Sequence, residues 1–191
     1  LYSSAASDVY KRQLNNQGGV VVGNQLLLTN NGLLDNRGGQ LVGDRLSLST
    51  QRLDNQGAGL LAAGSDGLLL TLTADGATPG QLLNSQGRLQ SDGHLQVNGG
   101  QLNNSGGVIL GESVGINAAG LDNSARGAVV AKAGGLHVAL NNGVLNNSAG
   151  VIDAGDQALK VTQLARLDNQ GGTLKGKRLE VDGGALDNRQ G

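Results

Sequence analysis

The hydrophobic residues of this chain recur in a fixed order that is longer than one strand. Each unit opens on a leucine followed by Asp or Asn, then Asn, then a glycine corner, as in Leu34-Asp35-Asn36-Arg37-Gly38-Gly39. A short aliphatic run follows, such as Val20-Val21-Val22, and then two apolar residues two positions apart, such as Leu46 and Leu48. A period of two places both side chains on one face of a β-strand. The helical spacing i, i+3, i+4, i+7 is not sustained anywhere, so the pattern predicts strands throughout.

The opening leucines set the length of the unit. Counted along the sequence, they are 20, 19, 30, 19, 19, 24, 22 and 19 residues apart. Three short strands in a period of 19–20 residues, with Gly, Asn, Asp or Ser at the corners, predict one coil of a solenoid. Such short strands become stable when successive coils pair in parallel, about 4.8 Å apart, and place leucine over leucine. The sequence therefore predicts an all-β parallel β-helix of about nine coils, opening at Leu14, Leu34, Leu53, Leu83, Leu102, Leu121, Leu145, Leu167 and Leu186.

A second regular position is the asparagine two residues after each opening leucine. It occurs in eight of the nine units, and Ser85 takes its place in the remaining one. Asparagine tolerates left-handed backbone at a corner, and stacked Asn side chains form amide ladders between coils. We expect glycines with positive φ at the following corner. The predicted structural ladder consists of Asn16, Asn36, Asn55, Asn104, Asn123, Asn147, Asn169 and Asn188.

Two units are longer than the others. Segment 73–81, between Leu72 and Leu82, contains the only proline and predicts a loop or small hairpin that protrudes from one face. A smaller excursion surrounds Asn141-Asn142-Gly143. Insertions in solenoids fall on one face and sometimes bind partners, which makes the loop a candidate contact site. The alternative is a surface insertion that the fold tolerates. The candidate contact residues are Asp75, Thr78 and Pro79.

Composition narrows the possible functions. The chain has 34 Gly, two Tyr and no Cys, Met, Trp or Phe, so its core has to be aliphatic, and disulfides or thiolate metal sites are excluded. Hydrophobic residues make up 38% of the chain, too many for a solvated disordered tail. The net charge of −1 offers no basic surplus for nucleic acid or an anionic membrane. No apolar run approaches the roughly 20 residues of a membrane helix, so we expect no membrane insertion.

The beginning of the chain does not follow the repeat. Residues 1–13 hold both tyrosines and no glycine, and we expect a foreign or disordered leader, such as a cloning or sequencing remnant. The predicted repeat domain covers 14–191. Because the sequence opens without Met and without a signal peptide, we expect an internal fragment of a longer protein.

The array resembles the filamentous-haemagglutinin repeats of two-partner secretion exoproteins, which include adhesins and contact-dependent growth-inhibition proteins. The resemblance rests on the phrases at 34–41, 102–109 and 167–174, and covers 14–191. It implies a right-handed parallel β-helix in a long filament that is secreted and displayed on the bacterial cell surface. It also implies an outer-membrane transporter as the partner during export, and a receptor or glycan on a host or neighbouring cell bound through the parent protein.

The acidic residues are candidates for catalytic groups, because parallel β-helices also include enzymes that cleave polysaccharides. One slot alternates between acid and amide, which favours a corner capper over a pair of tuned catalytic carboxylates. His94 and His137 occupy different positions in different coils, so no metal or other cofactor is expected. We expect a structural shaft without enzymatic activity; the alternatives are a β-helical polysaccharide-acting enzyme, and an adhesive module that binds through 73–81. The slot contains Asp35, Asp54, Asp122, Asp168 and Asp187, with Asn15, Asn84, Asn103 and Asn146 in the other units.

Overall fold

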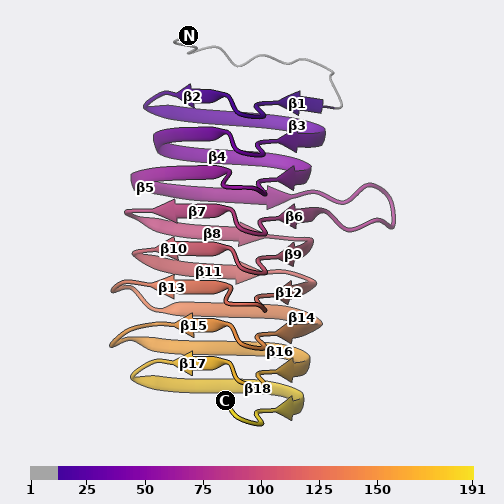
Figure 1. Cartoon of the computed structure of the whole chain (residues 1–191), viewed down its shortest axis with the longest axis vertical. Coiled ribbons are helices and arrows are strands. Elements are labelled where there is room, and N and C mark those ends of the chain that lie inside the picture. Colours follow the sequence, from indigo (N-terminus) through magenta and orange to yellow (C-terminus); the bar gives the residue numbers. More distant parts are fainter. Residues whose placement is uncertain (1–12) are drawn as a thin grey trace.

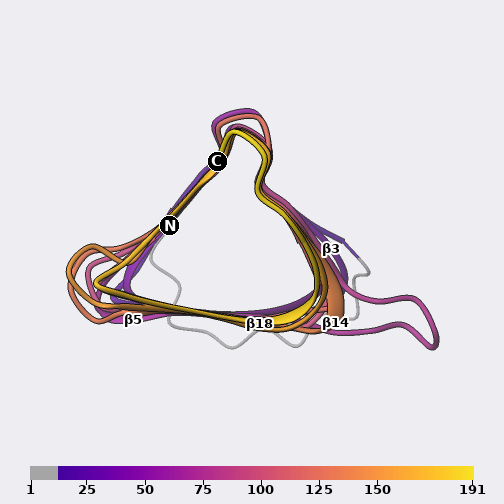
Figure 2. The same ribbon diagram turned by 90° about the horizontal axis from the view of Figure 1, so that it is seen from below.

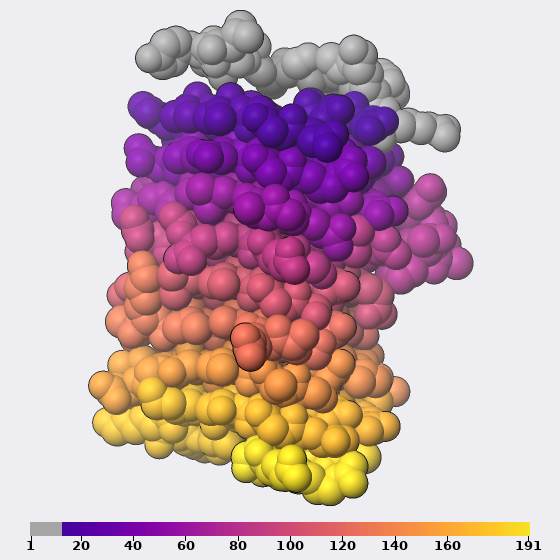
Figure 3. All heavy atoms as spheres, viewed as in Figure 1, coloured from indigo at the N-terminus to yellow at the C-terminus, as the bar shows by residue number. Residues whose placement is uncertain are grey.

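The computed structural model describes residues 13–191, which form strands and no helix. It confirms the predicted all-β solenoid, because the chain winds through about nine triangular coils stacked into a rod (Figures 1 and 2). Seen from the C-terminal end, the chain runs counter-clockwise as it approaches the viewer, so the coil is right-handed (Figure 2). The space-filling view shows neighbouring coils in contact along the length of the rod (Figure 3).

Each coil contains three extended segments, and each segment pairs in parallel with the same segment of the next coil. We call the three resulting surfaces the first, second and third face. The first face carries the aliphatic run, the second the alternating apolar pair, and the third the opening leucine phrase. In several coils two or three segments join as one bent strand, so three predicted strands become fewer, longer ones.

The strands have the following bounds. Those confined to the first face are β2 (Val20–Val22), β7 (Arg88–Ser91), β10 (Val108–Gly111), β13 (Ala128–Ala131), β15 (Val151–Asp153) and β17 (Thr173–Lys175). The second face alone contains β8 (His94–Asn98) and β11 (Ser113–Asn117), and the third face alone contains β1 (Gln13–Asn15), β6 (Gln81–Leu83), β9 (Gln101–Asn103) and β12 (Gly120–Asp122). The bent strands are β3 (Gln25–Asp35), β4 (Gln40–Asp54), β5 (Leu60–Leu72), β14 (Leu136–Asn146), β16 (Ala158–Asp168) and β18 (Arg178–Asp187).

The core is one aliphatic column that runs down the rod. Leu34 pairs with Leu53, Leu53 with Leu82, and Leu82 with Leu102, so each opening leucine lies over the next. The buried opening leucines are between 0% and 3% exposed, and the inward residues of the other two faces complete the column. Burial of each such side chain contributes about 1.5–3 kcal/mol to stability, so the stack needs no aromatic residue.

The register shows that the predicted boundary of the fourth unit was wrong by one residue. Leu82, rather than Leu83, pairs with Leu53 and Leu102, and it is 0% exposed. Asn84, rather than Ser85, therefore occupies the ladder position, and the intervals around it are 29 and 20 residues. The two adjacent leucines fit the phrase equally well by type, and only the alternation of inward and outward side chains separates them. Leu83 consequently occupies the outward slot that holds Asp or Asn in the other coils.

Both predicted excursions leave the rod at the corner between the second and third faces. Segment 73–80 joins β5 to β6 as a small hairpin closed by two backbone hydrogen bonds between Asp75 and Thr78, of 2.9 and 3.0 Å. It projects sideways from the rod (Figures 1 and 2). The smaller excursion bends β14 at Asn141 and Asn142, both of which have positive φ. At the other end of the sequence, β1 begins at Gln13, and the remainder of the predicted leader lies outside the described residues.

Candidate functional site

The structure stacks nine asparagines into one ladder along the third face. Nδ2 of Asn36, for example, donates to Oδ1 of Asn55 over 2.7 Å, and also lies 3.2 Å from the carbonyl oxygens of Gly39 and Leu60. All eight asparagines predicted for the ladder lie in it, and Asn84 is the ninth member. Asn36, Asn55, Asn84 and Asn104 are 0% exposed, so these amides satisfy one another inside the rod.

The glycine corner contains two positions with different requirements. At Gly38, φ is +60°, and the equivalent corner positions accept Gln86 and Ala149 at similar φ values of 58° and 55°. The next residue, Gly39, has no positive φ, but a Cβ there would overlap the carbonyl oxygen of Asn16 in the preceding coil. Close approach of two coils, rather than backbone freedom, therefore requires this second glycine. The nine copies of this position are Gly19, Gly39, Gly59, Gly87, Gly107, Gly127, Gly150, Gly172 and Gly191.

The acid slot lies at the end of the third-face strands and shapes the corner that follows. Oδ1 of Asp122 accepts the backbone N–H of Ser124 over 3.1 Å, and Oδ1 of Asn103 accepts that of Ser105 over 3.0 Å. Aspartate and asparagine therefore form the same Asx turn, in which the side-chain oxygen accepts a hydrogen bond from the backbone N–H two residues further along the chain. The same bond is made by Asn15, Asp35, Asp54, Asn146, Asp168 and Asp187.

Two of these carboxylates also form close ion pairs. Nη2 of Arg37 lies 2.6 Å from Oδ2 of Asp35, and its Nε lies 2.9 Å from Oδ1. The hydrogen bonds from Arg37 hold the pKa of the Asp35 carboxyl below its ordinary value. Arg189 lowers the pKa of Asp187 in the same way, over 2.8 Å. A general acid at neutral pH needs the opposite shift, so neither carboxyl is tuned for that role.

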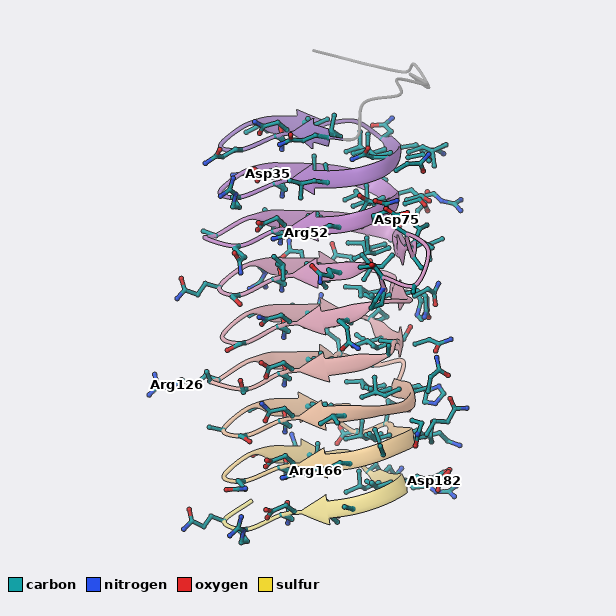
Figure 4. All side chains as sticks on the ribbon, turned by 90° about the vertical axis from the view of Figure 1, so that its right-hand side faces the viewer. Asp35, Arg52, Asp75, Arg126, Arg166 and Asp182 are labelled. Atoms are coloured by element: carbon teal, nitrogen blue, oxygen red, sulfur yellow. The ribbon has the colours of Figure 1, made fainter. Side chains whose placement is uncertain are left out.

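The candidate contact residues of the hairpin are all accessible to solvent. Asp75, Thr78 and Pro79 are exposed, and Gly76 takes a φ of +55° in the turn. Gly80, at the base, is buried against Leu72, which anchors the hairpin to the rod. Figure 4 shows the position of Asp75 on the hairpin, beside the third face.

The two histidines are bound by different neighbours on the second face. Nδ1 of His94 lies 2.7 Å from Oγ of Ser113, and Nε2 of His137 lies 3.1 Å from Oγ1 of Thr162. Residues 13–191 contain no cluster of three or more His, Cys, Asp or Glu side chains that could hold a metal ion.

Sequence reasoning missed a shallow groove on the third face. It has a volume of about 370 Å³ and crosses the rungs of β6, β9, β12 and the end of β14. The signal was the row of outward residues that precede each opening leucine, where Gly120 stands between Gln101 and Val144. This row can be identified only when Leu82, rather than Leu83, is taken as the opening leucine of its unit, and the cross-coil pairing decides between the two. The groove is lined by Gln81, Leu82, Leu83, Gln101, Leu102, Asn103, Leu121, Asp122, Val144 and Asn146.

A scan against family models gives no match for the chain, and the searches of curated proteins and of solved structures give none either. The resemblance to filamentous-haemagglutinin repeats therefore rests on the repeated phrases themselves. The described part of the chain has no helix long and apolar enough to cross a membrane.

Proposed function

We propose that this chain is a segment of the shaft of a secreted, surface-displayed bacterial adhesin or growth-inhibition exoprotein. Its role is mechanical, since it holds a distal binding or effector region away from the cell. In this proposal an outer-membrane transporter exports the parent protein, which then contacts a receptor or glycan on a host or neighbouring cell.

The observation that carries the proposal is the unbroken asparagine ladder. It continues with bonds of 2.6–2.8 Å through units of 19 to 29 residues, and the additional residues are extruded at corners. A stack in which every coil contacts only its neighbours extends by a constant rise per coil, about 4.8 Å. Such a rod is suited to setting a distance, because its length depends on the number of coils and little on their sequence.

Removing one complete coil tests this role. Deletion of 37–55 joins Asn36 to Gln56, so that Asn36 is followed by the same corner that now follows Asn55. The chain has no cysteine, so Gln25→Cys and Lys177→Cys supply two spin-label sites near opposite ends. We expect the distance between the labels to shorten by about 5 Å with the circular dichroism spectrum of a β-protein retained.

The control is a deletion of 37–46, which removes about half a coil and places outward residues at inward positions. We expect it to lose cooperative unfolding. An unchanged label distance after the whole-coil deletion, or equal tolerance of both deletions, would contradict a rod with an additive length.

The hairpin supports a second candidate function, an adhesive module. Asp75, Thr78 and Pro79 are exposed on the hairpin that projects from the rod, where a partner can reach them. Loss of cell binding after removal of the hairpin, with the rod intact, favours this function over a passive shaft.

A further inference from the structure

The two excursions of the chain flank one part of the third face. In most coils the second and third faces are joined by a short link, such as Gln51 between Thr50 and Arg52. The hairpin 73–80 precedes β6, and the turn at Asn141–Asn142 precedes the last segment of β14, three rungs further along the same face. The rungs of β6, β9, β12 and β14 thus lie between two projecting segments.

The groove lies on these rungs, and Gly120 belongs to the row of outward positions that runs along it. Going along the rod, the outward residues before the opening leucines are Gln81, Gln101, Gly120 and Val144. Gly120 adds no side chain to this row, and the end of the Gln101 side chain lies over it, beside the groove of about 370 Å³. Arg52 and Arg166 occupy the same row one rung beyond either end, so they mark the limits of the groove without lining it (Figure 4).

The polar side chains of the groove retain hydrogen-bonding capacity. Oδ1 atoms of Asn103 and Asp122 are used by the corner turns, and Nδ2 of Asn146 donates to Asp122 over 3.1 Å. Within residues 13–191, Nδ2 of Asn103 and Oδ2 of Asp122 have no hydrogen-bond partner, nor do the side-chain amides of Gln81 and Gln101. The groove therefore presents free amide donors and acceptors and one carboxylate oxygen on a surface fixed by the sheet.

We propose that this groove binds a short neutral oligosaccharide. Sugar hydroxyls donate and accept hydrogen bonds, which matches primary amides and a carboxylate, and the aliphatic side chains of Leu83 and Val144 can cover the C–H faces of the rings. The lining contains no Lys or Arg, which disfavours sulfated, phosphorylated or uronate glycans. It contains no aromatic side chain, so we expect a dissociation constant in the millimolar range at a single groove. This binding goes beyond the shaft role, because a spacer needs no ligand.

Adding a side chain at Gly120 tests the proposal, because it displaces the end of the Gln101 side chain that lines the groove. Gly120→Val introduces the residue that Val144 places in the same row one rung away, and the three atoms nearest to the new Cβ all belong to the flexible end of the Gln101 side chain. Gly115→Val is the matched control, since Gly115 faces outward on the second face and is covered by the flexible end of Gln96. Gln101→Ala is a second variant, which truncates an exposed side chain and leaves the backbone unchanged.

The full chain is titrated with short neutral gluco-, manno-, galacto- and N-acetylglucosamine oligosaccharides, and with uronate oligosaccharides, while amide chemical shifts are followed by NMR. We expect at least one neutral class to shift amides of β9 and β12, with affinity reduced about tenfold by Gly120→Val and at most twofold by Gly115→Val. Gln101→Ala should weaken the same class. The proposal is overturned if no neutral class binds at about 20 mM, if uronates bind in preference, or if Gly120→Val and Gln101→Ala both bind like the unmodified chain. The coil-deletion experiment is independent of this outcome, so the shaft and the groove can fail separately.

Discussion

Asn55 and Asn84 are 29 residues apart in the chain, yet Nδ2 of Asn55 donates a hydrogen bond of 2.8 Å to Oδ1 of Asn84. Between them lie a full coil, a wide corner at 64–67 and the hairpin 73–80. The corresponding ladder bonds between coils without insertions are 2.7 Å long, so the insertions leave the ladder almost unchanged. The stacking of leucine and asparagine between coils therefore sets the period, and additional residues form loops at the corners.

Substitutions of Asn84 and of its neighbour Ser85 should differ in their effect on stability, because only Asn84 is part of the ladder. Asn84→Ala removes the acceptor for Asn55 and the donor for Asn104, both 0% exposed, and leaves buried amide atoms without partners. We expect the free energy of unfolding to fall by about 3 kcal/mol. Ser85→Ala removes only a hydroxyl that reaches Asn103 at the surface over 3.1 Å, and should cost less than about 1 kcal/mol. Urea unfolding of both variants measures the difference, and a larger effect at Ser85 would restore the register that the sequence first suggested.

The two corner glycines should respond differently to alanine. At Gly107 an added Cβ would overlap the carbonyl oxygen of Asn84, which is fixed in the coil above, so Gly107→Ala should destabilise the chain by about 2–3 kcal/mol. At Gly106 the nearest atom to an added Cβ is 3.5 Å away, and Gln86 and Ala149 already occupy equivalent positions. Gly106→Ala should therefore cost about 1 kcal/mol, the ordinary cost of left-handed backbone for a residue with a side chain. Equal losses in thermal unfolding of the two variants would show that the close approach of the coils adds no cost at Gly107.

Most of the fold can be predicted from the sequence, because every coil repeats the same pattern of residue types. Leucine at inward positions, asparagine at the ladder and glycine at the corner recur nine times, so an error in one coil does not propagate to the next. Leu82-Leu83 was ambiguous because both residues satisfy the apolar requirement, and the deciding constraint, pairing with Leu53 and Leu102, is made across coils. The strict second glycine was assigned to φ for the same reason, since the clash that requires it involves the preceding coil.

The candidate site was predicted less completely than the fold. The protruding hairpin followed from the length of its unit and its proline, but the groove depends on outward residues from four coils. Gly120 alone carries no signal in the sequence, where it is one of 34 glycines. It acquires meaning only between Gln101 and Val144, which lie next to it in register and 19 and 24 residues away in the chain.

The hairpin should be removable without loss of the rod. Replacing 73–80 with a single glutamine copies the link that Gln51 makes between Thr50 and Arg52, and the register pairs those residues with Leu72 and Gln81. Because the ladder bond from Asn55 to Asn84 does not involve the hairpin, we expect the melting temperature to change by less than about 4 °C. Circular dichroism melting checks the rod, and a loss of the cooperative transition would mean that the hairpin is part of the core. The same variant removes one of the two projecting segments beside the groove, so any glycan affinity it retains is set by the face itself.

The ion pair of Asp35 should make stability depend on pH in the acid range. The folded pKa of Asp35 is lowered by Arg37, so its contribution is present above the unfolded pKa, about 3.9, and is lost as pH falls through the folded value. Asp35→Asn keeps the corner bond to the backbone N–H of residue 37, as Asn103 does in its own coil, but removes the charge. We expect this variant to be less stable than the unmodified chain at neutral pH and to differ from it progressively less below about pH 4.

Asp122→Asn is the matched control for that comparison. It makes the same change in the same slot, but within the described residues Asp122 has no arginine paired with it. Urea unfolding of the three proteins at neutral pH and at acid pH gives the two differences directly. The ion-pair explanation fails if the stability deficit of Asp35→Asn at neutral pH persists unchanged in acid. It also fails if Asp122→Asn shows the same deficit, because the effect would then come from the corner turn that both positions share.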